Sequence, residues 1–446
     1  MPCGPDHYFS QAMTGIPFNR EAIEVMAPAG SFESLRAAIS GGADAVYFGV
    51  EHLNMRTKSA RNFLTTDLPL IARYCRFCGV KSYLTLNTII YDQEIELSHQ
   101  LIDAAQEAGI SAVIASDQSV IDYALSRGVA LHLSTQLNIS NFETLRFYSK
   151  YADVMVLARE LTLDQISGIA GKISATGVAG PSGKPVRLEL FVHGALCMAV
   201  SGKCYLSLHQ YNTSANRGRC LQACRRAYRV EDIESGDQLE IDQEYIMSPK
   251  DLATIHFLDR ILASGITVLK IEGRARPAEY VKTVTSCYRE AVDSLFDGTY
   301  GPEKVEKWKE RLATVFNRGF WDGYYLGQRL GEWSAVYGSA ATKRKILIGT
   351  ATNYYSRLGV GEFDIQSEYL TVGEEVLITG PTTGLIETTV EEIHNQGGRV
   401  QSALKGERIA FRTGRKIRRG DKLFKWVSQD LSPDRKPVAD TEDVRG

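Results

Sequence analysis

The sequence lacks the features that mark a membrane or secreted protein. No stretch of about 18 or more apolar residues occurs, so no membrane-spanning helix is expected. Residues 1–20 lack the basic start and the apolar run of a secretion signal. We therefore expect a cytoplasmic protein without membrane association, whose thiols stay reduced and whose cysteines form no structural disulfides.

A strong charge of either sign is also missing. The 446 residues carry 51 Lys and Arg against 53 Asp and Glu, a formal net charge of -2. This balance excludes a global basic field, so any RNA-binding patch must be local. The length and a 44% share of hydrophobic residues predict two or three globular domains with large cores.

Short apolar runs alternate with amphipathic helical patterns between residues 23 and 295. Helical stretches such as 33–40, 94–108 and 141–151 separate many of the runs. Buried parallel strands alternating with helices predict an α/β fold, a TIM-like (β/α)8 barrel, with a doubly wound open sheet as the alternative. The expected strands are 23–26, 45–48, 81–86, 112–115, 130–133, 153–157, 187–192 and 267–271.

Polar tails at the ends of these strands favour the barrel. In a barrel the carboxyl ends of all strands meet around one mouth, where such folds place their chemistry. An open sheet would spread the tails along an edge, and any single tail is more simply a polar loop. The tails are residues 27–30, 87–88, 116–118, 134–136, 159–160, 193–194 and 272–274.

Four cysteines follow the seventh expected strand: Cys197, Cys204, Cys220 and Cys224. Their spacing, C-x6-C-x15-C-x3-C, provides only one of the two short knuckles usual in zinc sites. An iron–sulfur cluster tolerates irregular spacing because its ligands surround a larger core. Spacing alone leaves zinc and a cluster about equally favoured, and unliganded buried thiols are the third reading. The segment lies in an excursion over residues 195–264, which we expect to cover the barrel mouth.

The rest of the excursion carries weaker signals. A hairpin is expected from residues 227–233 and 244–247, followed by a helix start at residues 248–251. Four arginines lie near the cysteines: Arg217, Arg219, Arg225 and Arg226. They could offset the negative charge of thiolates or bind an anion. For Arg225 and Arg226, a solvated loop is an equally good interpretation. Cys75 and Cys78 look like packing residues at a helix end, and Cys3 and Cys287 are isolated.

The chain divides into five expected parts. They are an N-terminal arm (1–22), the barrel (23–295), a helical connector (296–343), a C-terminal all-β barrel (344–427) and a flexible tail (428–446). Alternating strands split by glycine turns predict the all-β part. Its basic run at residues 412–419 could contact RNA or form a solvated turn.

Several motifs together resemble one family. Residues 189–197 (ELFVHGALC) and 201–207 (SGKCYLS) are similar to the signature of the collagenase-like peptidases of family U32. Residues 216–220 (NRGRC), 248–252 (SPKDL) and 270–274 (KIEGR) agree as well, as do residues 27–30, 47–49 and 61–63. The likeness spans roughly residues 22–430 and looks most like the branch that hydroxylates the tRNA wobble uridine at carbon 5.

The resemblance implies a tRNA-modifying enzyme with a 4Fe-4S cluster on the four cysteines, and prephenate as a required metabolite. Zinc remains the alternative metal, and the electron donor stays unidentified. Peptidase activity is the alternative function, but Gly-x-Ser-x-Gly and His-Glu-x-x-His motifs are absent, and a cysteine protease needs one thiolate paired with a histidine. A third reading is an RNA-binding or other RNA-hydroxylating factor with a structural cluster.

Five arginines are the candidates to bind the two carboxylates of prephenate: Arg56, Arg61, Arg159, Arg274 and Arg276. Arg61 and Arg274 are favoured because they lie in family-like motifs. Lys250 and Asp251 could transfer protons, but a helix-start ion pair is the preferred reading. The expected catalytic residues are Arg61, Arg274, Glu272, His193, Lys250 and Asp251. The expected substrate contacts are Arg56, Asn62, Asn87, Gln136, Arg159, Arg217 and Arg219.

Overall fold

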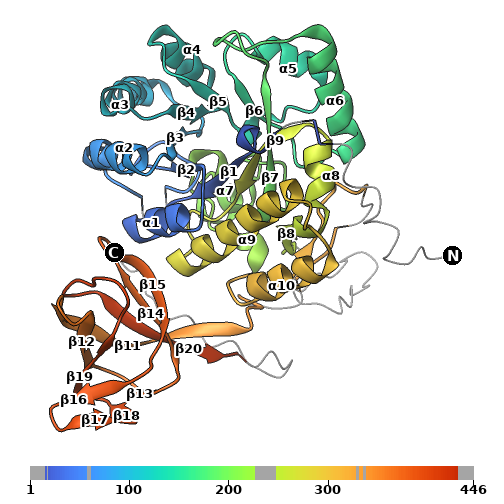
Figure 1. Ribbon diagram of the computed structural model, residues 1–446. Coiled ribbons are helices and arrows are strands. Elements are labelled where there is room, and N and C mark those ends of the chain that lie inside the picture. Colours follow the sequence, from blue (N-terminus) through green and yellow to red (C-terminus); the bar gives the residue numbers. More distant parts are fainter. Residues whose placement is uncertain are drawn as a thin grey trace, which may run out of the picture.

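The computed structural model describes residues 16–17, 19–57, 62–226, 248–327, 331–334 and 338–429. Eight parallel strands form a closed barrel, because β9 pairs with both β1 and β7 and so joins the two ends of the sheet (Figure 1). This closure confirms the barrel over the open sheet. The barrel strands are β1 (Glu24–Pro28), β2 (Ala45–Phe48), β3 (Lys81–Leu86), β4 (Ala112–Ala115), β5 (Leu131–Leu133), β6 (Val154–Val156), β7 (Arg187–Gly194) and β9 (Ile266–Ile271).

Helices surround the barrel and pack on the apolar residues that its strands direct outward. Local signals set the helix ends: Ser31 and Ser34 form a reciprocal capping box before α1, and Gly109 ends α3 with a φ of 76°. No helix among the described residues is long and apolar enough to cross a membrane. The helices are α1 (Phe32–Ser40), α2 (Leu68–Phe77), α3 (Ile95–Ala108), α4 (Gln118–Ser126), α5 (Phe142–Tyr148), α6 (Leu163–Thr176), α7 (Leu206–Tyr211), α8 (Leu258–Ala263), α9 (Ala278–Phe296) and α10 (Pro302–Ala313).

Two short strands extend the barrel beside β7. β8 (Asp251–Ala253) pairs antiparallel with the last two residues of β7, and β10 (Phe320–Trp321) pairs with β8. The helix start expected at residues 248–251 is therefore wrong. Asp251 belongs to a strand because its N–H donates to Gly319 O at 2.9 Å, and α8 begins only at Leu258.

The segment after the barrel is helical only in part. α10 follows α9, but the chain then forms β10 instead of continuing as a helical connector. From Lys343 on, the expected all-β part is confirmed as an antiparallel region, with sheet order β15-β14-β20-β11-β12-β19-β16-β17 and a separate β13–β18 pair. Its strands are β11 (Lys343–Tyr355), β12 (Val360–Ile365), β13 (Tyr369–Thr371), β14 (Glu375–Gly380), β15 (Gly384–Thr389), β16 (Ile393–Asn395), β17 (Gly398–Val400), β18 (Ser402–Leu404), β19 (Arg408–Arg412) and β20 (Lys422–Ser428).

The all-β region packs against the α1 and α9 side of the barrel. Arg36 of α1 donates to Pro381 O at 3.0 Å, and Lys345 of β11 pairs with the buried Glu279 of α9 at 2.9 Å. The contact lies on the outside of the barrel and leaves the carboxyl ends of the strands free for a site.

Candidate functional site

Polar groups from different strand ends meet at the barrel mouth, as the tails predicted. The Asn87 amide after β3 donates to Ser134 Oγ at 3.1 Å and to Gln136 Oε1 at 3.4 Å, both after β5. Asn87 Oδ1 also accepts from the Met55 N–H at 3.3 Å. Asn87 and Gln136, expected as substrate contacts, therefore lie together at the floor of the mouth.

An ion pair joins the loop after β2 to the end of β9. Arg56 Nη2 lies 2.6 Å from Glu272 Oε1, and both side chains are largely buried. Burial would raise the pKa of Glu272, but Arg56, and then Arg159 and Arg274, lower it to about 2. Glu272 is therefore a carboxylate at neutral pH, and it acts on its surroundings as a fixed negative charge.

Arg274 is almost fully buried in the same place. Its Nη1 donates to Thr85 Oγ1 at 2.7 Å and to Asn54 Oδ1 at 3.0 Å. Burial lowers its pKa to about 10, so it remains charged at neutral pH. A Cβ at Gly49 would lie 2.7 Å from this Nη1, so the glycine leaves the space that Arg274 occupies.

Arg159 reaches the mouth from the end of β6. It stacks over the Phe191 ring at 3.9 Å and donates from Nη1 to Ala195 O at 3.2 Å, while its buried Nε has no hydrogen-bond partner. Three guanidinium groups, those of Arg56, Arg159 and Arg274, thus surround the single carboxylate of Glu272. The imbalance leaves positive charge to attract an anion.

The cysteine segment covers this mouth, and we call residues 195–226 the lid. Gly218, with a φ of +73°, approaches the loop after β2 so closely that a Cβ would lie 2.1 Å from Asn54 O. Asn216 O accepts from the Ile89 N–H at 3.1 Å, and Arg217 bonds to Ile89 O and Glu94. These contacts confirm the position expected from the sequence.

The four cysteines of the lid are free thiols, with Cys197 exposed and the other three partly exposed. Burial raises the pKa of Cys224, the Arg225 guanidinium lowers it, and the charges of Cys197, Cys220 and Cys204 raise it, so these three thiols lie within electrostatic reach of Cys224. Cys204 Sγ accepts from the Leu206 N–H at 3.5 Å, and Cys220 Sγ accepts from Ser207 Oγ at 4.0 Å. Hydrogen bonds of this kind stabilise thiolate ligands.

The spacing of the thiols bears on which metal they would hold. One zinc ion brings four sulfurs to about 4 Å of each other, since each bond is about 2.3 Å long. Among the described residues, no three His, Cys, Asp or Glu side chains are grouped to hold a metal ion. Four thiols are a donor set that either zinc or an iron–sulfur cluster takes, so the metal expected from the sequence stays a prediction.

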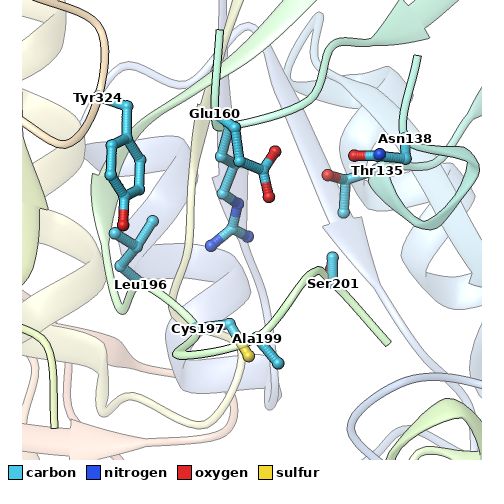
Figure 2. Close-up of a pocket in the computed structure, with 9 residues that line it drawn as sticks. Thr135, Asn138, Glu160, Leu196, Cys197, Ala199, Ser201 and Tyr324 are labelled. Carbon is cyan, nitrogen blue, oxygen red and sulfur yellow. The ribbon is translucent and has the colours of Figure 1, made fainter. Parts of the chain in front are cut away.

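A pocket lies between the lid and the ends of β5 and β6 (Figure 2). Cys197 and Ser201 of the lid form one wall, and Thr135 and Asn138 lie opposite (Figure 2). The pocket therefore places a thiol of the cysteine set beside amide, hydroxyl, carboxylate and guanidinium groups. Its lining is Thr135, Asn138, Arg159, Glu160, Leu196, Cys197, Ala199, Ser201 and Tyr324.

A second charged cluster anchors the lid, and no sequence pattern predicted it. Arg225 donates to Ser248 Oγ at 3.1 Å and to Pro249 O at 2.8 Å, so it is not a solvated loop residue. Buried Asp251 lies 3.4 Å from Arg318 and also interacts electrostatically with Arg225 and Arg276. Three arginines around one carboxylate tie the cysteine segment to β8.

Several expected catalytic residues are placed elsewhere. The His193 ring packs against Tyr280, Tyr288 and Phe320, and burial lowers its pKa to about 3. Lys250 pairs with Glu332 at 2.7 Å, so no ion pair joins it to Asp251 at a helix start. The catalytic role of these three residues stays a prediction, but none joins the Arg56, Arg159, Arg274 and Glu272 group.

Some of the remaining expected residues have structural roles, and others lie outside the described residues. Asn62 donates to Thr57 O at 3.3 Å and to Arg56 O at 3.4 Å, and so supports the loop that carries Arg56. Cys75 is buried in the last turn of α2, and Cys78 caps that helix, as expected for packing residues. Arg61, the hairpin at residues 227–233 and 244–247, and residues 430–446 of the tail lie outside the described residues.

The model of Peptidase family U32 matches residues 30–335, which include the barrel, the lid and the pocket. This chain belongs to that family. The family resemblance read from the sequence motifs is thus confirmed.

Curated relatives carry two kinds of name. A "Collagenase" from Porphyromonas gingivalis is 59% identical over 92% of this chain and 100% of its own length. The "tRNA hydroxylation protein P1" of Bacillus subtilis is 29% identical over 88% of this chain and 92% of its own. The 23S rRNA 5-hydroxycytidine synthase of Escherichia coli is 33% identical over 70% of this chain but only 46% of its own length. The family therefore includes both RNA hydroxylation proteins and proteins named as proteases.

Proposed function

We propose that this protein hydroxylates a pyrimidine of RNA, specifically carbon 5 of the wobble uridine of tRNA. The observation that carries the proposal is the pocket that Cys197 lines together with polar residues from the ends of β5 and β6. A pyrimidine there would meet Asn138 and Thr135, which can donate to or accept from the edge of a base. The likeness to the Bacillus subtilis tRNA hydroxylation protein over nearly the whole of both chains supports tRNA over ribosomal RNA.

Hydroxylation replaces a C–H bond by a C–O bond and removes two electrons, which protein side chains cannot accept. We propose that Cys197, Cys204, Cys220 and Cys224 hold a 4Fe-4S cluster, which would supply the redox chemistry when bound. The residues around the pocket would bind and orient the base. The lid would exclude water by closing the mouth, through the contacts of Gly218 and Asn216 with the loops below.

The required metabolite would be prephenate, bound at the three guanidinium groups of the mouth. Arg56, Arg159 and Arg274 carry three positive charges against the negative charges of Glu272 and the neighbouring Glu160, so the remaining positive charge would attract a carboxylate of the ligand. Arg159 is the strongest candidate for direct contact because its Nε has no hydrogen-bond partner. Arg56 and Arg274 already bond to Glu272 and to Thr85, and they would position the ligand through charge.

The test begins with protein purified without oxygen, in which iron, sulfide and the visible spectrum are measured. We expect four irons per chain, as the 4Fe-4S composition requires, and their loss in Cys197→Ser and Cys220→Ser but not in Cys75→Ser. Nucleosides of tRNA from a strain lacking the gene should then lack 5-hydroxyuridine derivatives. A colourless protein with one zinc per chain would overturn the cluster, and unchanged tRNA nucleosides would overturn the function.

The prephenate proposal has a separate test. Cells unable to make prephenate should lose the modified nucleoside, and added prephenate should restore it in wild type but not in Arg159→Ala. Calorimetry with the purified protein should show prephenate binding that Arg159→Ala weakens at least tenfold. Equal binding by wild type and variant would remove Arg159 from the site.

Peptidase activity remains a second candidate, because the 59% identical relative is named "Collagenase". The geometry gives it less support: His193, the histidine nearest in sequence to Cys197, is neutral and packed among aromatic rings. Digestion of gelatin by the purified protein tests for peptidase activity. Cleavage that survives both chelation and the double change Cys197→Ala with Cys204→Ala would favour a peptidase outside the lid.

A further inference from the structure

The lid differs in charge from the rest of the chain. Residues 195–226 include five Lys and Arg residues and no Asp or Glu, although acids outnumber bases over the whole sequence. Lys203, Arg219 and Arg226 are exposed, whereas Arg217 and Arg225 are engaged in contacts below the lid. The lid therefore presents a local positive surface on a chain whose net charge is negative.

The same surface exposes aromatic rings. Tyr205 is 69% exposed, Tyr211 is 37% exposed, and Tyr91, on the neighbouring connection from β3 to α3, is 50% exposed. Three exposed aromatic rings on or next to one basic segment are a feature of binding surfaces. Their phenol rings offer flat faces on which planar groups can stack.

Arginines hold two of these rings in place. Arg217 lies over the Tyr91 ring at 4.1 Å, while bonding to Ile89 O and Glu94. Arg226 lies over the Tyr211 ring at 5.2 Å and bonds to its hydroxyl. Rings fixed in this way lose little conformational freedom when a ligand binds.

We propose that the outer surface of the lid, formed by Tyr91, Lys203, Tyr205, Tyr211, Arg219 and Arg226, binds the unpaired nucleotides that flank the modified base. Bases would stack on the three rings, and the phosphates would contact the exposed cations. The inference rests on the proposed RNA substrate and specifies which part of it the protein reads. The pocket beside Cys197 lies on the inner side of the same lid. Flanking nucleotides bound to the outer surface would therefore bring the base to be modified to the entrance of the pocket.

A single-stranded ligand fits these features better than a duplex or a protein. Rings can stack only on bases that are not already paired and stacked, which a duplex does not offer. A protein partner would need acidic side chains to match the cations, whereas a single RNA strand offers bases to the rings and phosphates to the cations at regular intervals. The basic run of the all-β region could add affinity, but it carries no aromatic residue between positions 412 and 419.

The decisive experiment is fluorescence anisotropy with the intact, cluster-loaded protein and three RNA probes. The probes are an anticodon stem-loop, a fully paired hairpin of equal length and an unstructured strand of the loop sequence. We expect the stem-loop and the single strand to bind at least tenfold more tightly than the paired hairpin. Tyr205→Ala should weaken stem-loop binding about 5- to 150-fold, since stacking of one base on a ring contributes about 1–3 kcal/mol, and Tyr205→Phe should bind like wild type.

Matched variants separate stacking from charge and from damage to the fold. Phe147→Ala removes a ring that is 57% exposed on α5, away from the lid, and should bind like wild type. Arg219→Gln should lower the dependence of affinity on salt by about 0.7 in the logarithmic slope, the effect of one lost phosphate contact. Lys309→Gln on α10 should leave that slope unchanged.

Failure of this inference can be told from failure of the proposed function. Normal stem-loop binding by Tyr205→Ala and Tyr91→Ala, or equal affinity for the paired hairpin, would overturn the binding surface even if tRNA hydroxylation is intact. Tight binding that depends on these rings, with tRNA nucleosides unchanged in the deletion strain, would keep the surface and overturn the function. Capture of anionic vesicles or of an acidic protein in place of RNA would also overturn it.

Discussion

Glu272 and Arg56 are 216 positions apart in the chain, and their side chains meet at 2.6 Å at the mouth of the barrel. The pair closes one side of the mouth by joining the loop after β2 to the end of β9. Because Arg159 and Arg274 act on the same carboxylate, its charge sets the electrostatic balance of the whole site.

Glu272→Gln should destabilise the protein in a pH-dependent way. The folded-state pKa of about 2 lies below the ordinary value of 4.5, so the carboxylate contributes stability above pH 4.5 and loses it as pH falls towards 2. We expect the variant to unfold about 3 kcal/mol more easily near pH 6, with a smaller difference near pH 3. Urea titrations at both pH values measure it, and the exposed Glu310→Gln is the control. A difference independent of pH would contradict the prediction.

Gly218→Ala should lift the lid. Its Cβ would lie 2.1 Å from Asn54 O, a backbone atom that cannot move aside cheaply. Gly183→Ala is the matched control, because Gly183 has a similar φ of +76° but no atom within 4 Å of the added Cβ. We expect trypsin to cut the lid at least tenfold faster in Gly218→Ala, with iron lost in parallel, while Gly183→Ala costs about 1 kcal/mol and leaves the lid protected. Equal protection in both variants would show that the lid does not rest on Asn54.

His193→Phe decides whether His193 is catalytic or structural. Burial lowers its pKa to about 3, so wild-type stability should fall as pH decreases from 6.5 towards 3, because only the unfolded chain binds the proton there. The Phe variant should not lose stability over this pH range, and it should retain the proposed tRNA hydroxylation within about twofold. Activity reduced a hundredfold in a well-folded variant would restore the catalytic role expected from the sequence.

Asp251→Asn should weaken the anchor of the cysteine segment. The change leaves Arg318 and Arg276 without their buried carboxylate, a loss of about 3 kcal/mol for a broken buried pair. Thermal unfolding and iron retention should both decline, because Arg225 shares this cluster. Asp322→Asn, which breaks the partly exposed pair with His256, should change neither quantity.

The strands and the helices that separate them were predictable from the sequence. Runs such as 45–48 and 81–86 match β2 and β3 at both ends, because the strand residues that pack under the helices are apolar and leave a local pattern in the sequence. The cysteine set could also be recognised from the sequence, because its four members lie within one segment of the chain. The family signature around Cys197 and Cys204 is likewise local.

The tertiary structure alone decided which charged groups meet. The sequence offered Arg56, Arg159 and Arg274 as separate strand-end arginines, but only closure of the barrel through β9 brings them around Glu272. The same kind of long-range contact explains why the helix start predicted at residues 248–251 is wrong and why Arg225 is buried. Both follow from the pairing of β8 with β7. Pairing between distant segments leaves no local pattern in the sequence.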